Sequence, residues 1–448
     1  MELPVSFKDY EYLESILETF NGSLPSPRTK DLTTGILGEL FLRPYLPSKE
    51  LCKFGIGKED LKCVYAAIRS SEKARELFEF SPYHYLVQVL EHLSKDSERT
   101  SRIMSGETPF PLSETMELFI SEFCNAKCKF CYRNGNTYDE GRVLSTQEYV
   151  NLINEFADLQ GANLDVSGGL EPLLSPSILD VLKAGLDRKL KVSLYTNGIA
   201  MSNPDLMDLL VRIHKVRISL NAYDRESYKE VNGVNKFDVV LDNLRNLVKT
   251  KEDSKSKVRI GINLVVLREN YTHIFGAIKL AQEIGVDFLD LRSVEVTDFA
   301  YFDGKQGKEL GPILKQIRQE NLLGEHGKLN VSVGDTFGVI IDPNNDPLKY
   351  SRKKFVNALP YYRVNVTPQG KIYALNVIAQ PSREDQRYLL GEIGKHSSLY
   401  DILSSRKIVP FEPKLLLSHD ISLISALSKL ETDLEFGISL EENPFNWD

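Results

Sequence analysis

The stretch Cys124-Asn125-Ala126-Lys127-Cys128-Lys129-Phe130-Cys131 decides the fold, because it gathers three of the chain's five cysteines into one short segment. The spacing C-x3-C-x2-C lets three thiolates bind three corners of a [4Fe-4S] cube, which leaves the fourth iron without a protein ligand. A zinc site and reactive thiols are the alternatives. Zinc usually takes a fourth Cys or His nearby, and the closest histidines in the sequence are the distant His92 and His214.

Short apolar runs alternate with amphipathic segments from Met116 to about Val333, which predicts repeated βα units and a parallel sheet. Helix starts support this: Ser145-Thr146-Gln147-Glu148 is typical of a capping box, and Ser175-Pro176 and Asn203-Pro204 place a cap before a first-turn proline. The expected strands are 118–120, 164–166, 192–194, 216–220, 259–266 and 288–291. Six units predict an open partial barrel. The cysteines follow its first strand, at the edge where parallel α/β folds place their chemistry.

The segments on either side of this barrel differ from it in pattern. Apolar residues at three- and four-residue spacing predict helices within Tyr10–Phe20, Leu61–Ile68 and Tyr83–Leu93. Near the other end, two strands, 362–366 and 371–376, should form a hairpin around Pro368-Gln369-Gly370. We therefore expect a helical N-terminal domain over residues 1–112, the barrel over 113–335 and a small α+β extension over 336–448.

The cysteine motif and this fold together resemble the radical S-adenosylmethionine (radical SAM) enzymes. The resemblance implies an α/β fold with a partial (β/α)6 barrel and names Cys124, Cys128 and Cys131 as the metal ligands. It also implies two cofactors, a [4Fe-4S] cluster and S-adenosyl-L-methionine (SAM). In that family one electron from the reduced cluster breaks a carbon–sulfur bond of SAM and leaves a carbon radical. A flavodoxin- or ferredoxin-type protein is therefore the expected electron donor.

The resemblance also assigns SAM contacts to the ends of the strands. Ser167-Gly168-Gly169-Leu170-Glu171-Pro172 follows the second strand, and paired glycines let the main chain approach a ligand closely. The expected cofactor contacts are Phe130, Gly168, Gly169, Glu171, Asn197, Ser219, Asn221, Asn263 and Arg292. Structural alternatives stay open for them: a tight turn for the glycines, capping for Asn and Ser, core packing for Phe130, and a salt bridge with Glu295 for Arg292.

The substrate expectation depends on an absence in the sequence, because no cysteine follows Cys131. Many radical SAM enzymes hold an auxiliary cluster in a C-terminal extension. Without one, a net oxidation is harder to complete, so redox-neutral chemistry is favoured. The segments Gly168–Pro172, Tyr195–Asn197 and Arg217–Leu220 resemble those of deoxyaminosugar ammonia lyases and aminoglycoside diol dehydratases.

That resemblance implies a sugar or aminosugar substrate, which loses a hydrogen atom and then a neighbouring amine or hydroxyl group, as in antibiotic biosynthesis. The candidate bases are Glu295, Asp298 and Tyr301, and a separate reductase is a possible partner. Two alternatives remain: a maturase that modifies a ribosomally made peptide, and a non-catalytic iron–sulfur sensor.

The overall charge excludes some classes of partner. The 55 basic and 63 acidic residues give a net charge of -8, which argues against sequence-independent binding of nucleic acid or of an anionic membrane surface. We see no signal peptide and no apolar stretch long enough to span a bilayer, so we expect a cytoplasmic protein. Cys52 and Cys63 lie in apolar contexts and are expected to be buried structural thiols.

Overall fold

A computed structural model describes most of the chain. The described residues are 36–37, 39–40, 43–79, 84–131, 142–167, 169–294, 304–322, 324–334, 337, 347–376, 379, 385–394, 398–405, 409–410, 412, 416 and 418–447. The helix expected within residues 10–20 lies outside them.

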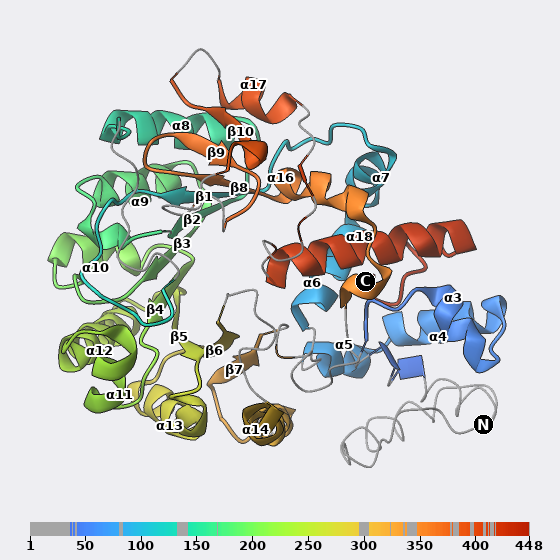
Figure 1. The fold of residues 1–448 in the computed structure, drawn as a ribbon, viewed down its shortest axis with the longest axis horizontal. Helices are drawn as coiled ribbons and strands as arrows, with labels where there is room; N and C mark the ends of the chain where they lie inside the picture. Colours follow the sequence, from blue (N-terminus) through green and yellow to red (C-terminus); the bar gives the residue numbers. More distant parts are fainter. Residues whose placement is uncertain are drawn as a thin grey trace.

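One sheet organises the described chain, in the strand order β10-β9-β8-β1-β2-β3-β4-β5-β6-β7 (Figure 1). Pairing is parallel from β8 through β7, and the β8–β9 and β9–β10 pairs are antiparallel. The strands are β1 Thr115–Phe119, β2 Asn163–Ser167, β3 Lys191–Thr196, β4 Lys215–Ser219, β5 Arg259–Val266, β6 Phe288–Ser293, β7 Asn330–Val333, β8 Arg363–Val366, β9 Lys371–Tyr373 and β10 Leu389–Glu392. The six expected barrel strands and the hairpin are thus confirmed. Strands β7 and β8 extend the parallel sheet on both sides. The sequence did not predict β7, nor the parallel pairing of β8 with β1.

Helices connect and cover the parallel strands. They are α8 Thr146–Asp158, α9 Ile178–Asp187, α10 Pro204–Leu210, α11 Arg225–Asn232, α12 Phe237–Asp253, α13 Ile274–Ile284 and α14 Gly304–Leu322. The capping box at Ser145 and the Asn203 cap are confirmed. The Ser175 cap is confirmed in part: Ser175 Oγ accepts from the Ser177 backbone at 3.3 Å, but α9 begins only at Ile178, with Ser177 as its N-cap residue. The Glu171 side chain caps the preceding 3₁₀ helix η3, Pro172–Leu174.

The two faces of the sheet differ in chemistry. Side chains alternate along a strand, so Met116 and Leu118 of β1 face the covering helices and join their buried core. Glu117, between them, faces the other way. The same alternation gives the concave side of the barrel a row of polar residues, namely Glu117, Asp165, Ser193, Arg217, Asp290, Ser332 and Arg363. We call this concave side the lumen.

The N-terminal helices and the chain end share a second core, which we call the flank. Buried residues of α4, α6 and α18 all belong to it, and α18 packs beside α6 (Figure 1). Its helices are α3 Ser48–Leu51, α4 Lys58–Arg69, α5 Glu72–Glu79, α6 His84–Lys95, α7 Ser97–Ser105, α16 Leu359–Tyr362 and α18 Ser418–Phe436; α17, Leu399–Ser404, packs on β10 and α8 instead. The domain boundaries remain a prediction, although these two sequence-distant segments pack as one body.

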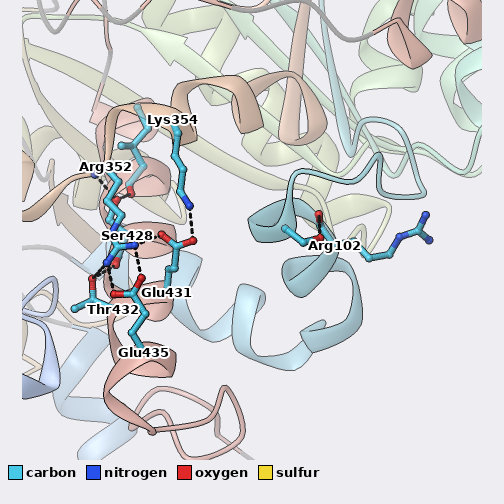
Figure 2. A network of polar contacts seen from close by, with 9 residues as sticks. Arg102, Arg352, Lys354, Ser428, Glu431, Thr432 and Glu435 are labelled. Carbon is cyan, nitrogen blue, oxygen red and sulfur yellow. Dashed lines mark hydrogen bonds and ion pairs between the residues drawn. The ribbon is translucent and has the colours of Figure 1, made fainter.

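Charged residues also join the flank to the segment before β8. Arg352 pairs with Glu431 and, at 2.5 Å, with Glu435 of α18, while Lys354 pairs with Glu431 at 2.5 Å (Figure 2). The backbone nitrogen of Arg352 donates to Ser428 Oγ at 2.7 Å. These contacts hold the 3₁₀ helix η6, Lys353–Ala358, against α18.

One expectation about the flank is wrong. Cys63 is exposed, because Leu61, Val64, Tyr65 and Ile68 form the buried face of α4 and leave position 63 on the opposite side. Cys52 is half-buried. Among the described helices, none has both the length and the apolar character needed to cross a bilayer.

Candidate functional site

The three cysteines lie on the segment that leaves the carboxyl end of β1, Cys124–Cys131, which we call the cluster loop. All three line one cavity of about 260 Å³ at the carboxyl ends of β2 to β6. The described cofactor candidates line it too: Phe130, Gly169, Glu171, Asn197, Ser219, Asn221, Asn263 and Arg292. Gly168 and the candidate bases Glu295, Asp298 and Tyr301 lie outside the described residues. The fold therefore gathers candidates from five strand ends around the thiols.

Glu171 connects the ends of β2 and β3. It is 3% exposed, and its carboxylate accepts hydrogen bonds from Thr196 Oγ1 at 2.5 Å and from the Asn197 backbone at 2.8 Å. Its own backbone nitrogen donates to the Phe123 carbonyl at 2.9 Å, one residue before the cluster loop. Buried carboxylates need such partners, so Glu171 fixes three segments of the cavity wall relative to one another.

Asn197 reaches the cluster loop from the β3 side. Its Nδ2 donates to Asn125 Oδ1 at 2.6 Å and lies 3.9 Å from Cys124 Sγ, while its Oδ1 accepts from the Ile199 backbone at 3.0 Å. Amide donors near cluster sulfurs influence the reduction potential of an iron–sulfur cluster. Asn197 thus lies in a position to orient Cys124 and to act on its sulfur.

Asn221 is fully buried and has a positive φ of 57°. Its Nδ2 donates to the Ser219 carbonyl and to Asn232 Oδ1, both at 3.2 Å, and its Oδ1 accepts from the Val265 backbone at 3.0 Å. Both amide hydrogens are therefore used within the protein. A contact between Asn221 and SAM could therefore use only an oxygen atom of this residue, whose amide group braces the wall between β4 and β5.

Asn263 has the opposite character. It is 8% exposed and lines the cavity, and its buried Oδ1 has no hydrogen-bond partner. An unsatisfied buried carbonyl costs about 1–3 kcal/mol. A ligand that donates a hydrogen bond here would remove that cost, so Asn263 is a credible ligand contact on physical grounds.

Two arginines add positive charge to the cavity wall. Arg217 lies 4.2 Å from the ring centre of Tyr195 and pairs with Asp290 at 3.3 Å. Burial opposes the ionisation of Asp290, but Arg217, Arg292, the hydrogen bond from Ser332 and the charge of Lys215 together lower its pKa below the ordinary value. The sequence assigned no contact to Tyr195, Thr196, Arg217 or Ser293, which also line the cavity. Their polar side chains at the ends of apolar strands are the signal that could have found them.

Deeper in the lumen lies an ion cluster that the sequence did not indicate. Arg363 of β8 pairs with Glu117 at 2.7 Å and with Asp165 at 3.0 Å, and Ser167 donates to Glu117. Burial alone would lower the pKa of Arg363, but Asp165 and Glu117 raise it well above the ordinary value. This cluster joins β8 to β1 and β2 below the cavity.

The residues present fit both expected groups. Three thiols on one loop, none in a disulfide, are the donor set that iron–sulfur clusters take, and Asn263, whose buried Oδ1 has no partner, lines the adjoining cavity. Across the described ranges no three Cys, His, Asp or Glu side chains form a preset metal site.

Comparison with known proteins identifies the central part of the chain. Residues 118–281 match the model of the Radical SAM superfamily. A curated protein of Saccharolobus islandicus, "Probable GTP 3',8-cyclase", is 25% identical over 46% of this chain and 65% of its own length. A protein of the same name from Sulfurisphaera tokodaii is 29% identical over 40% of this chain and 55% of its own. The chain thus spans less than two thirds of these relatives.

Solved structures with a similar fold include Streptococcus suis SuiB bound to precursor peptide SuiA. It has 16% identity and a TM-score of 0.49, and the match covers 65% of this chain and 67% of that one. Native anSMEcpe with bound AdoMet has 17% identity and a TM-score of 0.47, covering 65% of this chain and 81% of that one. Radical SAM domains use a [4Fe-4S] cluster and SAM, and these are the cofactors of residues 118–281.

Proposed function

We propose that this chain, whose residues 118–281 form a radical SAM domain, removes a hydrogen atom from a sugar or aminosugar and so causes redox-neutral loss of a neighbouring amine or hydroxyl group. One combination of features supports this most: the cavity beside the thiols is lined by polar and charged side chains, and no cysteine follows Cys131. A polar cavity suits a hydroxyl-rich substrate. Without cysteines for a second cluster, the chain has no evident acceptor for an electron from the substrate.

Bound together, the cluster and SAM supply a carbon radical that can remove a hydrogen atom. The chain's own residues hold and shield these groups. Cys124, Cys128 and Cys131 hold the cluster, and Asn263 offers SAM a free acceptor. Arg217 and Arg292 suit a phosphate or carboxylate of the substrate, because a guanidinium forms paired hydrogen bonds with either group. A nucleotide-linked sugar would carry such phosphates, and the curated relatives are named for a nucleotide substrate, GTP.

The elimination itself needs a base rather than an oxidant. Loss of hydrogen from a hydroxyl-bearing carbon makes its O–H acidic, and a base then accepts that proton. The neighbouring group leaves with its bonding electrons and takes up a proton. A returned hydrogen atom, or one electron from a flavodoxin- or ferredoxin-type donor plus one proton, completes the product. Glu295, Asp298 and Tyr301 remain the base candidates, because they follow the cavity-lining Ser293 closely in the sequence.

Isotope transfer tests this proposal. Reduced enzyme is incubated with SAM and with nucleotide-linked aminosugars deuterated at the hydroxyl-bearing carbon, and 5′-deoxyadenosine is analysed by mass spectrometry. We expect deuterium in 5′-deoxyadenosine and release of ammonia or water from the sugar. Cys128→Ala is the control without a cluster.

Two outcomes would overturn the substrate class while leaving the cofactors in place. One is SAM cleavage with no deuterium transfer from any sugar. The other is transfer from a deuterated peptide, which would identify the chain as a peptide maturase instead.

A further inference from the structure

We propose that the carboxyl end of α11, Val231–Gly233, is the platform that positions the cluster loop, with Asn232 and Gly233 as positioning residues for the cluster. The proposal depends on the radical SAM domain and not on the identity of the substrate. It would stand even if the proposed sugar chemistry were wrong.

The backbone contacts between the two segments come first. The last carbonyls of a helix have no partner within that helix. In α11, the Asn232 carbonyl accepts from the Lys127 backbone at 3.0 Å, and the Val231 carbonyl accepts from the Lys129 backbone at 2.9 Å. Lys127 and Lys129 stand on either side of Cys128. The cluster loop thus caps α11, and in return α11 holds the main chain on both sides of one metal ligand.

Gly233 makes this approach possible. It ends α11 with a φ of 70°, and a Cβ built there would lie 2.3 Å from the Lys127 carbonyl oxygen and 2.9 Å from its carbonyl carbon. Both are main-chain atoms of the cluster loop, so they cannot rotate away as a side chain could. Any side chain at position 233 must therefore displace the loop next to Cys128.

Asn232 anchors the platform to the cavity wall. It is 1% exposed, its Nδ2 donates to the Leu220 carbonyl at 3.0 Å, and its Oδ1 accepts from Asn221 Nδ2 at 3.2 Å. The backbone carbonyl of Asn221 in turn accepts a hydrogen bond from Asn270 Nδ2 at 3.2 Å. These three buried asparagines connect the cluster loop to the ends of β4 and β5, so the loop and the cavity wall share one rigid support.

An ion pair joins the same two segments but cannot explain the placement. Lys129 Nζ lies 2.9 Å from Glu230 Oε1, yet the two side chains are 48% and 51% exposed. Exposed pairs of this kind contribute little to stability. The buried backbone contacts at Gly233 and Asn232 are therefore the ones to test.

The chain offers a matched control for Gly233. Gly285 ends α13 in the same left-handed conformation, with a φ of 82°, but the nearest atom to its built Cβ is Val248 Cγ1 at 3.9 Å. Asparagine tolerates the left-handed conformation better than most residues. Comparing Gly233→Asn with Gly285→Asn thus separates the steric effect on the cluster loop from strain at a helix end.

Both variants are reconstituted anaerobically, and iron loss to a chelator is followed. We expect Gly285→Asn to match the wild type and Gly233→Asn to lose iron roughly tenfold faster, the scale of change typical for residues that support metal ligands. In the metal-free proteins, amide hydrogen exchange over residues 124–131 should be faster for Gly233→Asn alone. Equal iron loss and equal exchange in the two variants would overturn the proposal.

Asn232→Ala keeps the helix end and Gly233 intact, so it provides a second test if Gly233→Asn fails to fold. We expect intermediate iron loss and faster exchange over residues 124–131. Wild-type values for both measurements would overturn the proposal. Neither measurement uses a substrate, so a failure here is distinct from a failure of the proposed function.

Discussion

Arg363 in the lumen and Arg352 on the flank connect distant segments in similar ways, but their partners differ in burial. The two arginine side chains are 27% and 31% exposed. Glu117 and Asp165, the partners of Arg363, are 10% and 8% exposed. Glu435, a partner of Arg352, is 58% exposed. The other partner of Arg352, Glu431, also has Lys354 as a second cation.

This comparison shows that the burial of the carboxylates, and not of the arginine, decides how much a network matters. Removing Arg363 would leave two buried acids facing each other without a cation. Removing Arg352 would leave one acid in water and one still paired. Loss of charge should therefore matter more at Arg363 of the lumen than at Arg352 of the flank. The predictions below test this contrast between lumen and flank.

The largest expected effect concerns the cysteines of the two regions. Cys128→Ala at the lumen should abolish both the cluster and reductive SAM cleavage, because a cluster ligand is lost. Cys63→Ala is the matched control, since Cys63 is exposed on α4 of the flank and should leave both unchanged. Iron and sulfide content and 5′-deoxyadenosine formation with dithionite measure the outcome. SAM cleavage retained in Cys128→Ala would contradict the assignment of the cluster loop.

The next effect is on stability. Arg363→Met should lower the free energy of unfolding by about 3 kcal/mol, because it leaves Glu117 and Asp165 without their cation. Urea unfolding of the metal-free protein measures it. Arg363→Lys keeps the charge and should lose less. A loss below about 1 kcal/mol for the Met variant would mean that water already screens the lumen acids.

A smaller effect is expected at the unpartnered polar atoms. Asn263→Ala should weaken SAM binding by roughly three- to tenfold, the contribution of one hydrogen bond. Ser94→Ala is the flank control, because Ser94 Oγ is also buried and unpartnered but lies on α6. Isothermal titration calorimetry on the reconstituted proteins gives both affinities. Unchanged affinity in Asn263→Ala would show that Oδ1 does not contact SAM.

The smallest effect should come from the flank network. Arg352→Ala should cost less than about 1 kcal/mol of unfolding free energy, because Glu435 is exposed and Glu431 keeps Lys354. Raising the salt concentration should shrink the difference from the wild type further. Urea unfolding at low and high salt checks both points. A loss as large as that of Arg363→Met would break the contrast between the two regions.

Local sequence patterns predicted much of the fold. Apolar runs predicted β1 to β6, because each strand buries its own residues against helices that follow it closely in the chain. The predicted start of α9 was too early for a local reason too: Ser175 Oγ caps the turn before the helix, and the helix itself begins at Ile178. The sequence did not predict that β8 pairs with β1, because no pattern near residues 363–366 indicates a pairing with residues 115–118.

By itself, the sequence predicted the cluster ligands, and it determined the six βα units and the strand ends that line the cavity, because spacing and periodicity are properties of short segments. Only the tertiary structure decided which polar groups form hydrogen bonds within the protein and which have no partner there. Asn221 and Asn263 look alike in the sequence, yet the side chain of Asn221 bonds to Asn232 and Val265, whereas Asn263 Oδ1 has no partner. Such partners come from separate strands and helices, and only packing brings them within hydrogen-bond distance.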